Sequence, residues 1–153
     1  MDLSDKNVLM YGAGLGDAWL AKRCKSLIVI ERNEDWLYKA AENCVRNGAF
    51  VNYIHRPCND SDGKADYYCE IPTDKDYHVI INDDAYRTEV VFKAIEYFKG
   101  KKYDGILICE IGGKIMYGKA RQLLKHFQDM KAIFILNQTI QILKNPDANG
   151  KQQ

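Results

Sequence analysis

Three glycines and one glutamate near the start of this 153-residue chain have the spacing of a ligand site. Gly12, Gly14 and Gly16 follow the apolar run 7–11, and Glu31 ends the next apolar run, nineteen positions after Gly12 (31 − 12). Closely spaced glycines let the backbone turn sharply and approach a ligand. A carboxylate about 20 residues beyond the first glycine can bind the hydroxyls of a ribose. Together the two features indicate a nucleoside-containing cofactor.

The residue at position 17 narrows the choice of cofactor. A dinucleotide fingerprint, GxGxxG, requires glycine there, whereas this chain has Asp17 and the pattern GxGxG. Negative charge at the start of the following helix disfavours a pyrophosphate, and a cationic sulfonium ligand without phosphate would tolerate it better. A tight strand–helix turn that binds nothing is the alternative interpretation of the three glycines.

Acidic residues also end two later apolar runs. Asp83 and Asp84 close one of them and Glu110 closes the other. Open α/β sheets bind ligands at the carboxyl ends of their strands, so we expect a catalytic or cofactor role for the aspartate pair, with helix capping as the alternative. Tyr86 and Arg87 could position an anionic substrate, although a solvated helix start explains them equally well.

The overall composition excludes several classes of function. The formal net charge is +1, from 22 basic and 21 acidic side chains, so no basic excess indicates a nucleic-acid partner. The five cysteines form no CxxC pair and no metal-like cluster with the three histidines, so we expect no metal site and free thiols in the cytoplasm. No secretion signal is evident, and no apolar run approaches the ~20 residues of a membrane span.

Short apolar runs alternate with amphipathic stretches, which is typical of a mainly parallel sheet built from βαβ units. The predicted strands cover residues 7–11, 26–31, 49–55, 77–83 and 104–110. The predicted helices cover residues 17–24, 34–47, 87–100 and 117–129, the second capped by Asn33 and ended by Gly48. The adjacent runs 132–136 and 139–143 predict an antiparallel hairpin at the sheet edge. The polar connection 56–76 is predicted to hold at most a short element.

Two stretches carry a resemblance to a known superfamily. Residues 8–34 resemble motif I and the second-strand acid of class I S-adenosylmethionine-dependent methyltransferases, and VIINDDAYRTEVVFKAIEYF, residues 79–98, is similar to their fourth strand and following helix. The resemblance implies a three-layer Rossmann-like α/β fold with a mainly parallel seven-stranded sheet of order 3-2-1-4-5-7-6 and an antiparallel strand seven. It implies one methyltransferase-like domain over residues 1–145, followed by a tail, 146–153, that we expect to be frayed.

The resemblance also implies where cofactor and substrate would lie. The implied cofactor-binding set comprises Gly12, Ala13, Gly14, Gly16, Asp17, Glu31, Arg32, Asp60 and Asp83. In this arrangement Glu31 would bind the ribose hydroxyls and Arg32 would flank the adenine. Asp60, or its neighbours Cys58 and Asn59, would lie near the adenine edge. Asp83 would face the methionine end as the catalytic residue. The implied substrate-binding set comprises Asp84, Tyr86, Arg87 and Glu110.

Two departures from the superfamily pattern bear on function. An acid usually stands two residues before the first glycine and helps to hold the cofactor's ammonium group, but this chain has Met10 there. We expect Asp17 or Asp83 to hold the ammonium group instead. Few residues precede the first predicted strand, so we expect the connection 56–76 or a second subunit to cover the cofactor. The edge hairpin offers unpaired backbone for a twofold partner, which predicts a homodimer.

The sequence therefore predicts methyl transfer from S-adenosylmethionine to a small molecule or a protein, with S-adenosylhomocysteine as the product. A catalytically inactive, cofactor-binding or partner-binding domain is the first alternative, and Met10 favours it. A nicotinamide-dependent oxidoreductase is the second alternative, and Asp17 disfavours it.

Overall fold

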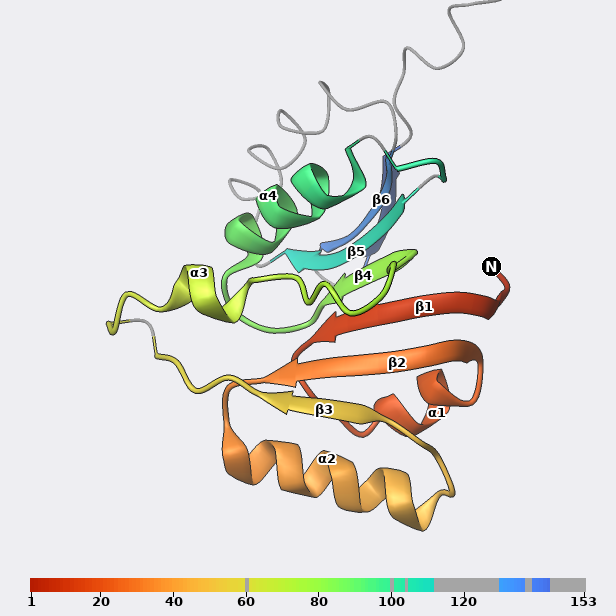
Figure 1. Cartoon of the computed structure of the whole chain (residues 1–153), viewed down its shortest axis with the longest axis vertical. Coiled ribbons are helices and arrows are strands. Elements are labelled where there is room, and N and C mark those ends of the chain that lie inside the picture. The colour runs from red at the N-terminus through yellow and green to blue at the C-terminus, as the bar shows by residue number, and fades with distance from the viewer. Residues whose placement is uncertain (60, 100, 104, 112–129, 137–138, 144–153) are drawn as a thin grey trace, which may run out of the picture.

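A computed structural model describes residues 1–153 except 60, 100, 104, 112–129, 137–138 and 144–153. At its centre five parallel strands run in the order 3-2-1-4-5 (Figure 1). These strands are β1 Leu3–Tyr11, β2 Cys24–Glu31, β3 Asn52–His55, β4 Val79–Asn82 and β5 Gly105–Ile111. The predicted parallel α/β architecture is confirmed. The helix predicted over 117–129 and the tail 146–153 lie outside the described residues.

Two further strands extend the sheet beyond β5. β6 Met130–Leu136 pairs parallel with β5, and β7 Thr139–Leu143 pairs antiparallel with β6. The predicted hairpin is confirmed, but the order β5-β6-β7 corrects the expected 5-7-6. The nearly continuous apolar run MKAIFIL suits an interior place between two strands. The shorter TIQIL, with polar residues at alternate positions, suits the sheet edge.

Helices pack on both faces of the parallel strands. Two of them, α1 Asp17–Ala21 and α2 Glu34–Arg46, share a core with one face, and α4 Arg87–Phe98 shares a core with the other. Alternate side chains of β2 enter the two cores: Leu27 and Val29 on the side of α1 and α2, Ile28 and Ile30 on the side of α4. Both sets are buried, which explains the continuous apolar run of this strand.

Two local predictions about element ends are confirmed. The Asn33 side chain accepts a hydrogen bond of 2.9 Å from the backbone N–H of Trp36 and caps α2. Gly48 follows that helix with a φ of +60°. The connection 56–76 holds one short helix, α3 Ala65–Tyr68, as predicted, and its Tyr68 is fully buried in the core beneath α4.

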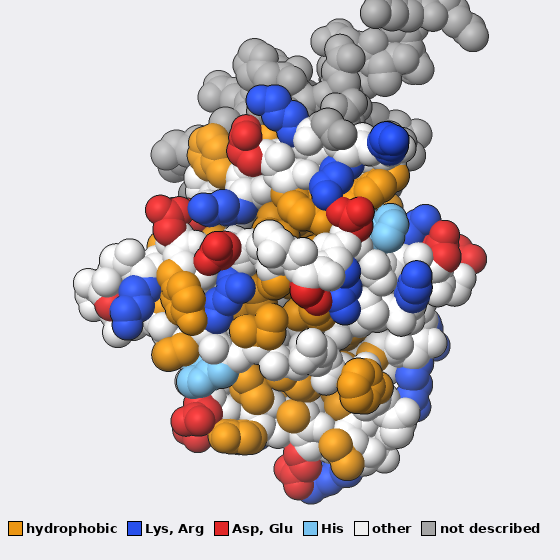
Figure 2. Space-filling view, viewed as in Figure 1, with side chains coloured by type: hydrophobic (Ala, Val, Ile, Leu, Met, Phe, Trp, Pro, Cys, Tyr) orange, Lys and Arg blue, Asp and Glu red, His pale blue; other side chains and the backbone are white. Residues whose placement is uncertain are grey.

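The surface carries charges of both signs. Figure 2 shows acidic and basic side chains interspersed over the face it displays, with hydrophobic side chains between them. This distribution agrees with the near balance of 22 basic and 21 acidic residues. Among the described helices, none combines the length and the apolar composition that crossing a membrane requires.

Candidate functional site

The glycine loop, residues 12–16, connects β1 to α1 at the carboxyl edge of the sheet. Gly12 has a φ of +93°, and a Cβ at this position would lie 3.0 Å from the Asp83 carbonyl oxygen and from Asp84 Cβ. Glycine is therefore required here by the close approach of the connection between β4 and α4. At Gly16, by contrast, an added Cβ would meet nothing within 4 Å. The loop's last glycine faces open space.

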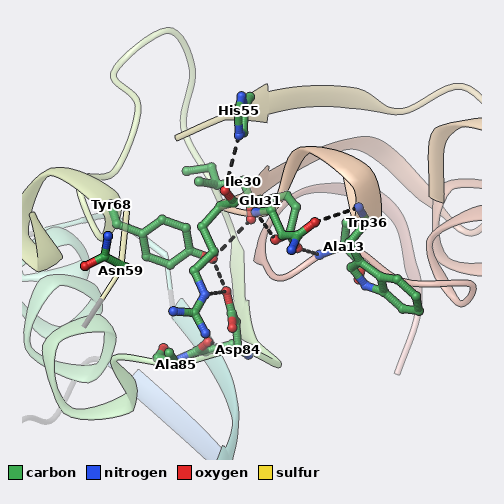
Figure 3. Close-up of polar contacts among 12 residues, drawn as sticks. Ala13, Ile30, Glu31, Trp36, His55, Asn59, Tyr68, Asp84 and Ala85 are labelled. Carbon is green, nitrogen blue, oxygen red and sulfur yellow. Dashed lines mark hydrogen bonds and ion pairs between the residues drawn. The ribbon is translucent and has the colours of Figure 1, made fainter. Parts of the chain in front are cut away.

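The Glu31 carboxylate ties the glycine loop to the end of β2. Glu31 is only 4% exposed. One carboxylate oxygen accepts the backbone N–H of Ala13 at 2.7 Å, and the other accepts the backbone N–H of Asn33 at 2.6 Å. The indole N–H of Trp36 donates to the Ala13 carbonyl from the first turn of α2 (Figure 3). Strand β2, the glycine loop and α2 thus meet around one carboxylate.

Asp17 braces the same loop from its other end. Its side chain is fully buried, and both carboxylate oxygens lie 3.1 Å from the backbone nitrogen of Gly14, which donates to them. The hydroxyl of Tyr53, on β3, donates to the same carboxylate at 2.9 Å. Burial raises the pKa of Asp17, although the bonds from Gly14 and Tyr53 oppose that rise. Cofactor binding by Asp17 stays a prediction.

A third group of polar residues forms where β4 ends. The hydroxyl of Tyr68 donates to the Asp84 carboxylate (Figure 3). Nε of Arg32 lies 3.4 Å from the same carboxylate. Burial and the neighbouring Asp84 carboxylate raise the pKa of Tyr68, so its hydroxyl stays protonated as a donor. The Arg32 guanidinium also lies 5.8 Å from the ring centre of Tyr86. The connection 56–76, β2 and the start of α4 are joined through this group.

A cavity of about 600 Å³, here called the polar cavity, lies beside these three groups of residues. It is lined by Gly12, Ala13, Glu31, Arg32, Asn33, Asp35, Trp36, Lys39, Cys58, Asp83 and Asp84. Six of these were predicted from the sequence to be site residues: Gly12, Ala13, Glu31, Arg32, Asp83 and Asp84. Its size lies within the range of roughly 300–1,000 Å³ typical of small-molecule sites.

Other predicted residues are placed differently. Five of them do not line the polar cavity: Gly14, Gly16, Asp17, Tyr86 and Arg87. Asp60 lies outside the described residues, and of Glu110 the structure describes only its place in β5. Within the described residues, no group of three or more metal-ligating side chains could hold an ion.

Sequence reasoning missed the contribution of α2 to the cavity. Asp35, Trp36 and Lys39 come from its first two turns, which lie at the same sheet edge as the tip of β2. The available signal was the Asn33 cap, because a helix that starts directly after a strand end presents its first turns to that edge. Cys58, which was predicted as an alternative to Asp60 near the adenine edge, lines the polar cavity.

Comparisons with known proteins bear on the fold. No protein-family model matches the chain, and no curated protein is similar to it in sequence. Among solved structures it is similar to a precorrin 8W decarboxylase from Methanobacterium thermoautotrophicum, with a TM-score of 0.60 and 16% identity over 93% of this chain and 77% of that one. It is also similar to a short chain dehydrogenase from Mycobacterium smegmatis, with a TM-score of 0.53 and 13% identity over 88% and 77%.

A dimethyladenosine transferase from Plasmodium falciparum matches with a TM-score of 0.46 and 18% identity over 61% of this chain, which spans 32% of the length of that protein. The fold follows from the sheet order and from the likenesses to the decarboxylase and the short chain dehydrogenase, both with TM-scores above 0.5. The chain has a Rossmann-like α/β fold. Identities this low show the fold alone, because Rossmann-like folds host methyltransferases, dehydrogenases and other activities.

Proposed function

We propose that the polar cavity binds S-adenosylmethionine and that the protein transfers its methyl group to an acceptor. The observation that carries the proposal concerns the backbone N–H groups of the glycine loop. Those of Ala13 and Gly14 already donate to the buried carboxylates of Glu31 and Asp17. In a dinucleotide site such N–H groups are free to bind pyrophosphate. A pyrophosphate here would instead meet two carboxylates, which favours a cofactor without phosphate.

The charges of the polar cavity support the same choice. Its lining includes four carboxylates and two cationic side chains: Glu31, Asp35, Asp83, Asp84, Arg32 and Lys39. One of the cations, Arg32, is paired with Asp84. The excess of acidic groups disfavours a phosphate and favours the positively charged sulfonium and ammonium groups of S-adenosylmethionine.

Individual residues fit parts of that ligand. Each oxygen of Glu31 accepts one backbone N–H, and a carboxylate offers about four acceptor positions in all. Acceptor positions therefore remain for a ribose diol. Because Asp17 is buried against Gly14 and Tyr53, Asp83 is the better placed of the two aspartates for the ammonium group. Arg32 and Trp36 would flank the base.

Isothermal titration calorimetry with S-adenosylmethionine, S-adenosylhomocysteine and NAD tests the proposal. We expect the first two to bind and NAD to give no heat of binding at the same concentrations. If NAD binds and S-adenosylhomocysteine does not, the proposal is overturned in favour of an oxidoreductase. Binding of S-adenosylmethionine that is never demethylated, with extracts and defined acceptors present, would support an inactive cofactor-binding domain.

A further inference from the structure

A second cavity, of about 450 Å³, lies on the side of the glycine loop that faces α1, and we call it the apolar cavity. It is lined by Met1, Leu3, Met10, Gly16, Trp19, Leu20, Ile81, Asn82, Asp83 and Ile108. Seven of these ten side chains are large and apolar. The first residues of the glycine loop line the polar cavity, and its last glycine lines the apolar one. The loop therefore separates the two.

The floor of the apolar cavity is one row of side chains across three adjacent strands. Met10 on β1 is in register with Ile81 on β4, and Ile81 is in register with Ile108 on β5. All three are partly buried and pack against the core on the side of α1 and α2. Trp19 and Leu20 of α1 form a wall, and Trp19 is 60% exposed. The row thus forms an apolar surface beside a wall that a ligand can reach.

Asp83 lines both cavities. It follows β4 directly, so it stands above the row of Met10, Ile81 and Ile108 at the carboxyl edge of the sheet. Asp83 is exposed to solvent. A molecule in the apolar cavity would thus have its polar end beside the same carboxylate that faces the cofactor.

We infer that the apolar cavity binds the methyl acceptor, and that this acceptor is a small molecule with an apolar body and one nucleophilic O–H or N–H group. The inference rests on the proposed function. A lone pair of the acceptor forms a bond to the methyl carbon, and the carbon–sulfur bond breaks with its electron pair left on sulfur. The acceptor's proton goes to the Asp83 carboxylate. Holding both reactants around one residue supplies the proximity that such a transfer needs.

An acceptor with an apolar body also explains why position 10 holds a methionine and not an acid. Where the resembled superfamily usually has an acid, this chain has an apolar side chain that forms part of the cavity floor. An acid there would face Ile81 and place an unpaired charge in an apolar surface, which is costly. A methionine at this position suits a ligand with an apolar body, because its flexible thioether packs against varied shapes.

The test uses the full chain with ¹³C-labelled isoleucine δ1 methyl groups and 2-naphthol as an apolar probe that carries one O–H group. We expect nuclear Overhauser effects from the probe's ring protons to the methyl groups of Ile81 and Ile108, with and without S-adenosylhomocysteine. Replacing Trp19 by Ser should weaken probe binding tenfold or more and leave S-adenosylhomocysteine affinity unchanged. Tyr38→Ser is the matched control, because Tyr38 is 62% exposed on α2 and lines neither cavity.

The possible results separate this inference from the proposed function. Probe contacts that miss Ile81 and Ile108, in a protein that binds S-adenosylhomocysteine, would overturn the acceptor site alone. Probe binding at these methyl groups in a protein that binds neither S-adenosylmethionine nor its product would overturn the proposed function and the acceptor role together. A dimer that Trp19→Ser dissociates would identify the cavity as a contact between two copies and also overturn the inference.

Discussion

At the residue scale, the carboxylates of Glu31 and Asp17 hold the glycine loop in place through hydrogen bonds to its backbone. Glu31 joins Ala13 to Asn33, and Asp17 joins Gly14 to Tyr53. The sequence predicted the residue types and their approximate place. It did not predict that the carboxylates accept the loop's own backbone N–H groups, because those bonds depend on how closely β2 and β3 approach the loop in three dimensions.

Replacing Glu31 by Ala is expected to weaken binding of S-adenosylhomocysteine tenfold or more. The variant loses hydrogen bonds from the ribose to a charged acceptor, which are worth about 1.5–3 kcal/mol. Calorimetric titration measures the effect. Asp35→Ala is the control, because it removes a carboxylate from the lining of the same cavity, in the first turn of α2. Equal losses in the two variants would contradict a specific role for Glu31.

Replacing Asp17 by Asn is expected to change the pH dependence of stability. Burial raises the pKa of Asp17 above its ordinary value of 3.8, so this carboxyl contributes stability below that value and loses it as the pH rises through its folded-state pKa. Asparagine cannot ionise. The free energy of unfolding of the variant, minus that of the wild type, should therefore rise with pH above about 4 and then level off. Urea denaturation across that range measures it.

A second variant checks the cause of this pH dependence. The hydrogen bond from the Tyr53 hydroxyl opposes the rise in the pKa of Asp17. Tyr53→Phe removes that bond, so the stability of this variant should fall over a wider pH range than the stability of the wild type. A difference between Asp17→Asn and wild type that does not vary with pH would show that this carboxyl titrates alike in the folded and unfolded chain.

At the scale of elements, sequence periodicity predicted which segments are strands and helices better than it predicted where they meet. The Asn33 cap and the run of β2 were predictable because they depend on local hydrogen bonds and on burial on both faces. The role of Gly12 was not. It depends on the connection between β4 and α4, which is about 70 residues away in sequence but packs against the loop.

Gly12→Ala and Gly16→Ala form a matched pair that tests this packing. At Gly12 an added Cβ meets Asp83 and Asp84 at 3.0 Å with the backbone at a positive φ, so we expect a loss of about 1–3 kcal/mol in the free energy of unfolding. At Gly16 the φ is −74° and the space is open, so the change should stay within about 1 kcal/mol. Urea denaturation of both variants decides. Equal effects would contradict the requirement for glycine at position 12.

At the scale of the whole molecule, two segments were expected to complete the site or to join two subunits. The connection 56–76 brings Cys58 to the polar cavity, so it does reach the site. Two of its apolar residues, Tyr68 and Cys69, are fully buried in the core of this chain. Arg56 of the same connection donates to the carbonyls of Tyr67 and Tyr68. Tyr67 of the same connection is 49% exposed, so part of this aromatic surface stays available to a ligand or a partner.

The edge strand carries the prediction of a homodimer. β7 pairs with β6 on one side, and among the strands of the described residues the sheet order places it last. A strand with one unpaired edge can join the same strand of a second copy across a twofold axis. We expect sedimentation velocity at tens of micromolar protein to show a dimer, and Ile140→Lys to shift it towards monomer, because a lysine on an edge strand opposes pairing. Glu42→Lys is the control and should leave the dimer intact, because Glu42 lies on α2, which contacts β2 and β3 at the other end of the sheet. A wild-type monomer, with and without S-adenosylhomocysteine, would rule out the dimer and leave the connection 56–76 as the segment that closes the polar cavity.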